Sequence, residues 1–287
     1  MTKKVLVVGA TGYLGKFLIK ELKKQGYWIR VLSRDKQKIE PLNASIDEIR
    51  LGEATQPETL KGLCQDIDIV ISSLGITKQK DGLTYMDVDY QANRNVLNEA
   101  LSHHVRHFMS ISVFNAHQLR HLEIVKAKEK FAQELIEAEI KHSIIRPNGF
   151  FSNMTEFFNM AKKGRVYLFA DGQCRANPIH GADLAKACVD YLESNGGEFD
   201  IGGPEILTQT EIASQAFEVL NKTSKFTYIP HWIKNLIIKF ARMFTSVKTY
   251  GPIEFFMTVL TMDMVAPTYG QHTLKEHFKE ISEINHS

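Results

Sequence analysis

The residues near the start of the chain that are best suited to chemistry form a glycine-rich loop. The segment Gly9-Ala10-Thr11-Gly12-Tyr13-Leu14-Gly15 directly follows the apolar run Val5–Val8 and leads into a stretch with helical periodicity. In such a loop one glycine permits a tight turn, another lets the backbone approach a pyrophosphate, and the third allows a helix to pack closely on a strand. Backbone N–H groups at the helix start then attract the phosphates. The loop therefore predicts a dinucleotide site formed by Gly9, Thr11, Gly12, Tyr13, Leu14 and Gly15.

The end of the second apolar run carries residues that select between the two nicotinamide cofactors. Where NAD is bound, an acidic residue usually holds the ribose hydroxyls at this place, and here the sequence has Ser33 followed by Arg34. A hydroxyl and a guanidinium suit the additional phosphate of NADP, and Lys38 is near enough along the chain to assist. Asp35 opposes this interpretation, because its carboxylate could neutralise Arg34. On balance the segment favours NADP(H) over NAD(H).

A third set of candidates lies on the helical segment Leu122–Glu139, which contains Lys126, Lys128 and Lys130. At about 100° per residue, Lys128 shares a face with the apolar residues of the segment, whereas the other two lysines lie on the opposite face. An ammonium on an inward face is costly unless it has a partner. The alternative is a lysine that extends to the edge of the apolar stripe. We predict that Lys128 belongs to the site.

These residues need alternating strands and helices to bring them together. The first half of the chain shows that alternation, which predicts an α/β Rossmann fold with a doubly wound parallel sheet. We expect residues 1–150 to form the dinucleotide-binding domain and 151–287 a smaller, mostly helical substrate-binding region, with some elements between 165 and 203 returning to the sheet. The expected strands are Val5–Val8, Tyr27–Leu32, Ile46–Leu51, Ile67–Ser72, His107–Ser112 and Ser143–Arg146, and the expected helices are Lys16–Lys24, Pro57–Cys64, Val88–Ser102 and Leu122–Glu139.

The composition limits the classes of function. The chain has 287 residues, 44% of them hydrophobic and 24% charged, with a formal net charge of +2. These values exclude a disordered chain and argue against nucleic acid as a partner. Three scattered cysteines predict neither a disulfide framework nor a metal site. The scattered cysteines favour a reducing cytoplasm, the first strand begins at once, and no apolar run is long enough for a membrane span, so a cytoplasmic location is expected. The expected state is a monomer or a homodimer.

Several further segments carry a family resemblance: Gly52–Thr55, Ser72–Gly75, Asp89–Asn93, Arg146–Phe151, Asn177–Ala185 and Gly202–Glu205. With the Gly-x-x-Gly-x-x-Gly spacing of the loop, they resemble the short-chain dehydrogenase/reductase superfamily, in its atypical branch of NmrA-like and isoflavone-reductase-like proteins. The resemblance implies an adenine site at Glu53 and Ala54, and a ribose and nicotinamide site at Ser73, Leu74 and Gly75. It also implies that Pro147, Asn148 and Phe150 pass the nicotinamide and lead to a substrate pocket with Phe151, Met154 and His180.

The catalytic residues of that superfamily are incomplete in this chain. Members commonly use a Tyr-x-x-x-Lys pair, in which the tyrosine donates a proton. Lys128 matches the lysine, but Ile124 stands where the tyrosine is expected. Isoflavone-reductase-like proteins also depart from the tyrosine pattern and place a lysine here, which implies that Lys128 orients the ribose or protonates the product. Ser112 is a further candidate hydroxyl, and the other candidate donors are Tyr85, His117 and His180.

The second half of the chain is rich in phenylalanine, with thirteen of the 17 at or after residue 150. This distribution points to an apolar pocket or surface. Thr208 and Glu211 predict a capping box before a helix over Gln209–Leu220, and Asp183 is expected to cap a helix over Leu184–Leu192. Residues 231–244 are typical of a basic amphipathic helix. Such a helix either lies on an anionic membrane or covers a substrate pocket, and we favour the pocket.

Together these patterns favour an NADPH-dependent reductase that transfers a hydride to a small hydrophobic carbonyl or activated alkene. The missing tyrosine favours an alternative, a non-catalytic NAD(P)H-binding sensor or an assembly or regulatory protein of the NmrA-like kind. A sugar-nucleotide epimerase fits less well, because such relatives normally keep the tyrosine and favour a polar pocket.

Overall fold

The structure of the protein, a computed structural model, describes residues 2–76 and 82–284. The chain divides into two compact units. The first comprises Met1–Arg146 and Leu184–Phe199, and the second comprises Pro147–Asp183 and Asp200–Ser287. The polypeptide therefore passes from one unit to the other after residues 146, 183 and 199.

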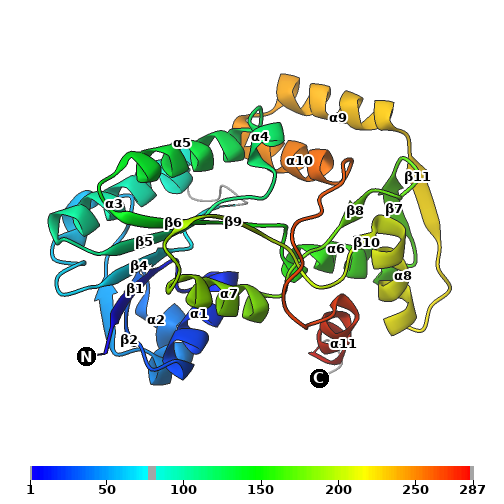
Figure 1. Cartoon of the computed structure of the whole chain (residues 1–287). Helices are drawn as coiled ribbons and strands as arrows, with labels where there is room; N and C mark the ends of the chain where they lie inside the picture. Colours follow the sequence, from blue (N-terminus) through cyan, green and yellow to red (C-terminus); the bar gives the residue numbers. More distant parts are fainter. Residues whose placement is uncertain (1, 77–81, 285–287) are drawn as a thin grey trace. The chain divides into compact units, whose positions relative to one another are not determined.

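A seven-stranded sheet forms the centre of the first unit, in the order β3-β2-β1-β4-β5-β6-β9. All five neighbouring pairs from β3 to β6 are parallel. Helices α1, α2 and α7 lie on one face of the sheet, and α3 and α5 lie on the other (Figure 1). This arrangement confirms the predicted α/β Rossmann fold. The strands are β1 (Lys4–Val8), β2 (Trp28–Ser33), β3 (Glu48–Leu51), β4 (Ile69–Ser72), β5 (His107–Ile111), β6 (Lys141–Pro147) and β9 (Gly197–Ile201), and the helices are α1 (Tyr13–Lys24), α2 (Lys36–Ile39), α3 (Asn93–Ser102), α4 (Ala116–Leu119), α5 (Glu123–Glu137) and α7 (Gly181–Tyr191).

The position of the site follows from the order of the central strands. The chain runs from β1 outward through β2 and β3, and then returns to β4 on the other side of β1. Strands β1 and β4 are buried on both faces, which accounts for their continuous apolar sequences. Because the connections diverge between β1 and β4, a crevice forms at the carboxyl ends of these strands. The segments after β1 and β4 therefore meet there.

Two of the expected helices differ from the prediction. The expected helix Pro57–Cys64 is only a short 3₁₀ helix, η2 (Pro57–Leu60), followed by turns. Gly62 has φ +75°, a left-handed conformation that ends a helix. The expected helix Val88–Ser102 begins instead as a π-helix, η3 (Met86–Ala92), which continues into α3. π-Helical turns are often found at functional sites.

The second unit is built around a phenylalanine-rich core. Its helices are α6 (Phe151–Lys162), α8 (Gln209–Val219), α9 (His231–Phe244), α10 (Val247–Val259) and α11 (Leu274–Ile284). Its strands pair as β7 (Val166–Phe169) with β11 (Phe226–Ile229), and as β8 (Arg175–Ala176) with β10 (Leu207–Thr208). Much of the phenylalanine surplus fills this core, rather than a pocket or surface; the core includes Phe151, Phe157, Phe158, Phe217 and Phe278.

Two predicted helix caps lie at the starts of α7 and α8. The capping box at α8 is confirmed, because the side chains of Thr208 and Glu211 bond reciprocally to the backbone. The prediction for Asp183 is wrong, since α7 begins at Gly181 and places Asp183 in its first turn. The Asp183 carboxylate instead accepts the N–H groups of Gln271 and His272, at 3.0 Å each. Within the described residues, no helix is both long and apolar enough to cross a membrane.

Candidate functional site

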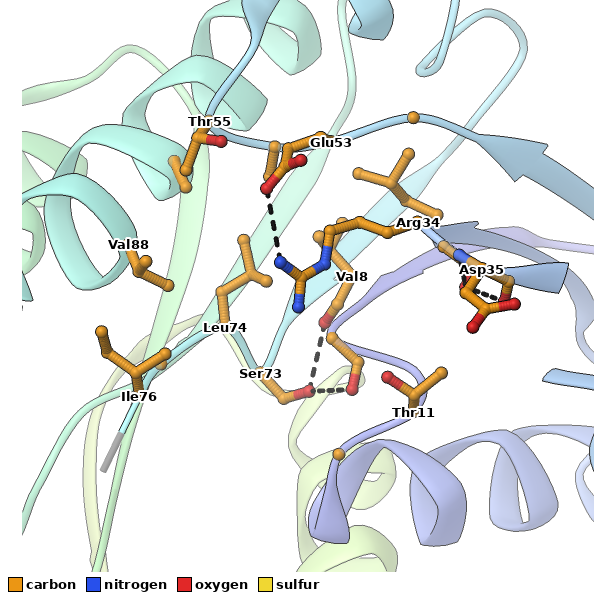
Figure 2. Close-up of a pocket in the computed structure, with 18 of the residues that line it drawn as sticks. Val8, Thr11, Arg34, Asp35, Glu53, Thr55, Ser73, Leu74, Ile76 and Val88 are labelled. Atoms are coloured by element: carbon orange, nitrogen blue, oxygen red, sulfur yellow. Dashed lines mark hydrogen bonds and ion pairs between the residues drawn. The ribbon is translucent and has the colours of Figure 1, made fainter. Parts of the chain in front are cut away.

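A cavity of about 500 Å³ opens where the segments after β1, β2 and β4 converge. This volume is within the range of small-molecule and cofactor sites. Eleven of the residues predicted for cofactor binding line it: Gly9, Thr11, Gly12, Ser33, Arg34, Lys38, Glu53, Ala54, Ser73, Leu74 and Gly75 (Figure 2). The sequence prediction did not include the other lining residues, which are Val8, Leu32, Asp35, Gly52, Thr55, Ile76, Leu83, Val88 and Ala92.

The glycine-rich loop forms one wall of this cavity. Gly9 has φ +84°, and a Cβ placed on it would lie 2.7 Å from the Ser73 Oγ, so only glycine fits between the two segments. The Ser73 hydroxyl donates to the carbonyl of Val8 at 3.1 Å and holds the two segments together. Gly12 is the N-cap of α1, whose start has neither a side-chain cap nor an acidic residue in its first turn. The positive end of α1 is therefore left for an anion, which fits a pyrophosphate.

The other three residues predicted from the loop, Tyr13, Leu14 and Gly15, belong to α1 and do not line the cavity. Leu14 and Gly15 are buried on the inner side of α1, and the Tyr13 ring packs edge-on against Phe17 at 5.3 Å. None of the three is among the residues that line the cavity. Their part in cofactor binding stays a prediction.

Two cations, Arg34 and Lys38, lie at the β2 side of the cavity. The Arg34 guanidinium is 3.4 Å from the Glu53 carboxylate and more than half exposed. The Asp35 carboxylate instead accepts the Gln37 N–H at 2.9 Å as the N-cap of α2. Glu53, which the resemblance assigns to the adenine, is therefore an ion-pair partner of Arg34 (Figure 2).

The Ser33 hydroxyl is hydrogen-bonded within the turn that follows β2. It donates to the Asp35 carbonyl at 2.8 Å and is largely buried. A phosphate at this edge would thus be met mainly by the side chains of Arg34 and Lys38 and by this turn's backbone.

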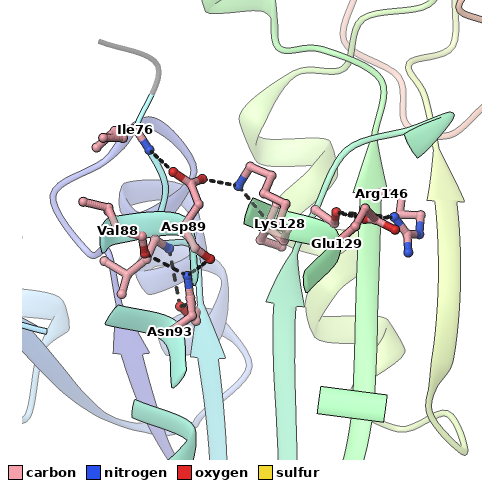
Figure 3. A network of polar contacts seen from close by, with 11 residues as sticks. Ile76, Val88, Asp89, Asn93, Lys128, Glu129 and Arg146 are labelled. Carbon is pink, nitrogen blue, oxygen red and sulfur yellow. Dashed lines mark hydrogen bonds and ion pairs between the residues drawn. The ribbon is translucent and has the colours of Figure 1, made fainter. Parts of the chain in front are cut away.

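Lys128 has a buried acidic partner, Asp89. The Lys128 Nζ is 2.9 Å from the Asp89 Oδ1, and the side-chain exposures are 16% and 0%. The second carboxylate oxygen accepts the Ile76 N–H at 3.3 Å (Figure 3). Burial raises the pKa of Asp89, and the nearby ammonium of Lys128 opposes that rise. The carboxylate therefore fixes the position of the Lys128 ammonium next to the segment that follows β4.

Gly75 separates this ion pair from the cavity. A Cβ on Gly75 would lie 2.8 Å from the Asp89 Oδ1 and 2.9 Å from the Lys128 Nζ. Gly75 also lines the cavity. The absence of a side chain at this position therefore lets the Lys128 ammonium approach the edge of the cavity.

The sequence prediction missed Asp89 as a functional residue. Asp89 and Asn93 are four residues apart, both are buried, and Asn93 is followed four residues later by buried Leu97. Two polar residues on the inward side of a helical segment were the available signal, because buried polar groups need partners. The Asn93 amide donates to the Asp89 carbonyl at 3.0 Å and its oxygen accepts from the Ser72 hydroxyl at 2.5 Å.

Ser112 lies in a separate polar network on the first unit. Its hydroxyl donates to the Glu129 carboxylate at 2.7 Å, and the Arg146 guanidinium is 2.5 Å from Glu129 and 2.6 Å from Glu198 (Figure 3 shows Glu129 and Arg146). The hydrogen bonds to both carboxylates raise the pKa of Arg146 against the effect of burial. In this arrangement the Ser112 hydroxyl already donates its hydrogen bond to the Glu129 carboxylate.

The position of the missing tyrosine is apolar in the structure as well. Ile124 is buried, and so is Tyr85, whereas His117 is exposed on α4. His180 belongs to the second unit, where its ring stacks on His272 with centroids 4.3 Å apart. Burial, with the nearby His272 and His277, lowers the pKa of His180 to about 4.

The other predicted residues of the nicotinamide side and the substrate pocket also lie in the second unit. The buried Asn148 donates to the Asn177 side chain at 2.7 Å, and Phe150 precedes α6 as its N-cap. Phe151 is 2% exposed in the phenylalanine core, and Met154 packs against that core. Contacts of Pro147, Asn148, Phe150, Phe151, Met154 and His180 with cofactor or substrate stay predictions.

Comparison with known proteins gives a consistent result. The profile of a family described as NAD(P)H-binding matches residues 9–195. The chloroplastic divinyl chlorophyllide a 8-vinyl-reductase of Arabidopsis thaliana is 28% identical over 320 residues, which cover 96% of this chain and 76% of that protein. The photosystem II assembly factor Ycf39 of Trieres chinensis is 23% identical over 288 residues, which cover 98% of this chain and 90% of that protein. The crystal structure of Citrobacter sp. triphenylmethane reductase with NADP(H) superposes with a TM-score of 0.76 at 17% identity, covering 96% of this chain and 99% of that one.

Proposed function

The chain belongs to the NAD(P)H-binding family whose profile matches residues 9–195, and from this premise we propose that it is an NADPH-dependent reductase of a small hydrophobic carbonyl or activated alkene. The relatives that support this proposal include a vinyl reductase that aligns over 96% of the chain. The observation that carries it is the Lys128–Asp89 pair beside Gly75, which keeps an ammonium at the edge of the cavity.

The residues of the cavity suit NADPH in a definite orientation. The Gly9–Gly12 loop and the start of α1 would hold the pyrophosphate, and Arg34 with Lys38 would hold the 2′-phosphate. Ser73, Leu74 and Gly75 would then border the nicotinamide ribose, close to Lys128. When bound, the reduced nicotinamide supplies a hydride to the substrate.

Lys128 would perform the task that a tyrosine–lysine pair shares in related enzymes. Its ammonium can donate hydrogen bonds to the ribose hydroxyls and a proton to the reduced substrate. Asp89 holds that ammonium in place without contacting substrate, so Asp89 is a positioning residue.

Turnover tests this function directly. NADPH oxidation is measured with a panel of apolar enones and aldehydes, and we expect turnover with at least one class. Lys128→Ala should weaken NADPH binding or reduce turnover by roughly tenfold or more, since a charge-assisted hydrogen bond is lost. Lys126→Ala is the matched control, because Lys126 lies on the same helix in an exposed pair with Glu123 at 2.6 Å. Equal rates and affinities in the two variants would remove Lys128 from the site.

A second candidate function is a non-catalytic NAD(P)H-binding assembly or regulatory protein. The buried Ile124 at the tyrosine position favours it, as does the similarity to the assembly factor Ycf39 over 98% of the chain. Tight NADPH binding without turnover on any member of the panel would support this candidate over the reductase.

A further inference from the structure

Helix α9 (His231–Phe244) presents an apolar face to solvent. No residue of this helix is buried. Four of its large apolar side chains are more than half exposed: Trp232 at 65%, Phe240 at 51%, Met243 at 62% and Phe244 at 71%. Leu236 and Ile237 are exposed beside them. At about 100° per residue, these side chains form one stripe along the helix, so the helix has a continuous apolar surface in water.

The stripe is not the side by which α9 is attached to the second unit. Helix α9 packs against α10, and its polar contacts there come from the opposite side. The Arg242 guanidinium is 2.6 Å from the Glu254 carboxylate, and the Lys234 Nζ donates to the Thr261 hydroxyl at 2.9 Å. An ordinary surface helix buries its apolar face and exposes its polar one. In α9 the apolar stripe is exposed instead, which marks an interaction surface.

The charge around α9 indicates what that surface meets. Residues 222–253 contain six lysines and arginines and no aspartate or glutamate, although the whole chain has a net charge of only +2. Lys239 is exposed and borders the apolar stripe next to Trp232 on the helix. A basic segment with an exposed tryptophan–phenylalanine face matches a surface that is anionic outside and apolar beneath.

We propose that α9 lies in the headgroup region of a lipid bilayer that contains anionic lipids. The helix is about 21 Å long and lies along the membrane plane. The stripe from Trp232 to Phe244 enters the acyl boundary, while Lys239 meets the lipid phosphates. No residue of α9 lines the cofactor cavity, so the proposal does not depend on the reductase activity.

Co-sedimentation of the full chain with lipid vesicles tests the proposal. We expect binding to vesicles of phosphatidylcholine with phosphatidylglycerol, and much weaker binding to phosphatidylcholine alone. The double variant Trp232→Ser, Phe240→Ser should lower the partition coefficient by at least about tenfold. Lys239→Glu should weaken binding to the anionic vesicles only. Tyr167→Ser is the matched control, because Tyr167 is an aromatic residue on β7 that is as exposed as Phe240, at 51%.

Three results would overturn the proposal. The first is a lack of binding to anionic vesicles, and the second is binding that the double variant leaves unchanged. The third is a lipid-free dimer, detected by light scattering, that dissociates in the double variant; the face would then be an interface between two copies. NADPH binding measured in every variant separates a loss of the fold from a loss of the surface.

Discussion

Arg34 has two competing partners at the cavity, the Glu53 carboxylate in the structure and a 2′-phosphate in the proposed complex. The guanidinium and the carboxylate are 3.4 Å apart in a partly exposed pair. Such pairs contribute at most about 1 kcal/mol, and a phosphate offers more negative charge and more acceptor oxygens than a carboxylate does. A phosphate can therefore displace Glu53 from Arg34, and competition from the Glu53 carboxylate lowers the affinity of the site for that phosphate.

This competition predicts opposite effects for two substitutions. Arg34→Ala should weaken NADPH binding by roughly tenfold or more and leave NADH binding almost unchanged. Glu53→Gln should strengthen NADPH binding by up to about fivefold, because it removes a like charge and frees the guanidinium. Dissociation constants for both cofactors, measured by fluorescence titration at one ionic strength, check both effects. Equal losses for NADPH and NADH in Arg34→Ala would contradict the assignment of the phosphate site.

At the level of the elements, local sequence patterns identified most of what positions the cavity. The continuous apolar runs predicted β1 and β4 because both strands are buried on both faces, and the glycine spacing predicted the phosphate-binding loop directly after β1. The sequence periodicity predicts a helix over this segment but does not distinguish the π-helical geometry of η3 from an α-helix. The inward-facing Asp89 and Asn93 were a signal in the sequence, but the partners of Asp89, which are Lys128 on α5 and Ile76 after β4, are set by the tertiary fold. Arg34–Glu53 likewise joins segments that only the folded sheet brings together.

The ion pair between Asp89 and Lys128 therefore links three elements: η3, α5 and the segment after β4. Asp89→Asn alone leaves a mostly buried ammonium without its counter-charge and should lower the free energy of unfolding by about 3 kcal/mol. Lys128→Met alone should cost a similar amount. The double variant should lose at least about 1 kcal/mol less than the sum, because it buries no unpaired charge. Urea unfolding gives the three values, and Glu123→Gln, which breaks the exposed pair with Lys126 on the same helix, should change stability by less than about 1 kcal/mol.

An additive result in that cycle would mean that the two side chains do not stabilise each other. NADPH affinity provides an independent measurement. It should fall in every variant that lacks Lys128, and Asp89→Glu should restore part of what Asp89→Asn loses if the carboxylate positions the ammonium.

On the scale of the whole molecule, each unit contains a histidine that resists protonation: His107 is buried and His180 is partly buried. Burial lowers the pKa of His107 in the first unit and of His180 in the second, in both cases from 6.5 to about 4. Between these values the unfolded chain binds a proton that the folded chain does not, so stability is lost as the pH falls from 6.5 towards 4. Acid should therefore destabilise both units.

His107 gives the sharper test, because it is 3% exposed on β5 and its Nε2 lies 2.9 Å from the Ser143 hydroxyl. His107→Gln keeps an amide for that hydrogen bond and cannot take up the proton. Over the fall from pH 6.5 to 4, the variant should lose up to about 3 kcal/mol less stability than the wild type. Urea unfolding followed by the fluorescence of Trp28 on β2 measures this difference, and His117→Gln, an exposed histidine on α4, is the matched control. Parallel pH curves for the wild type and His107→Gln would show that His107 becomes protonated without unfolding, which contradicts its lowered pKa.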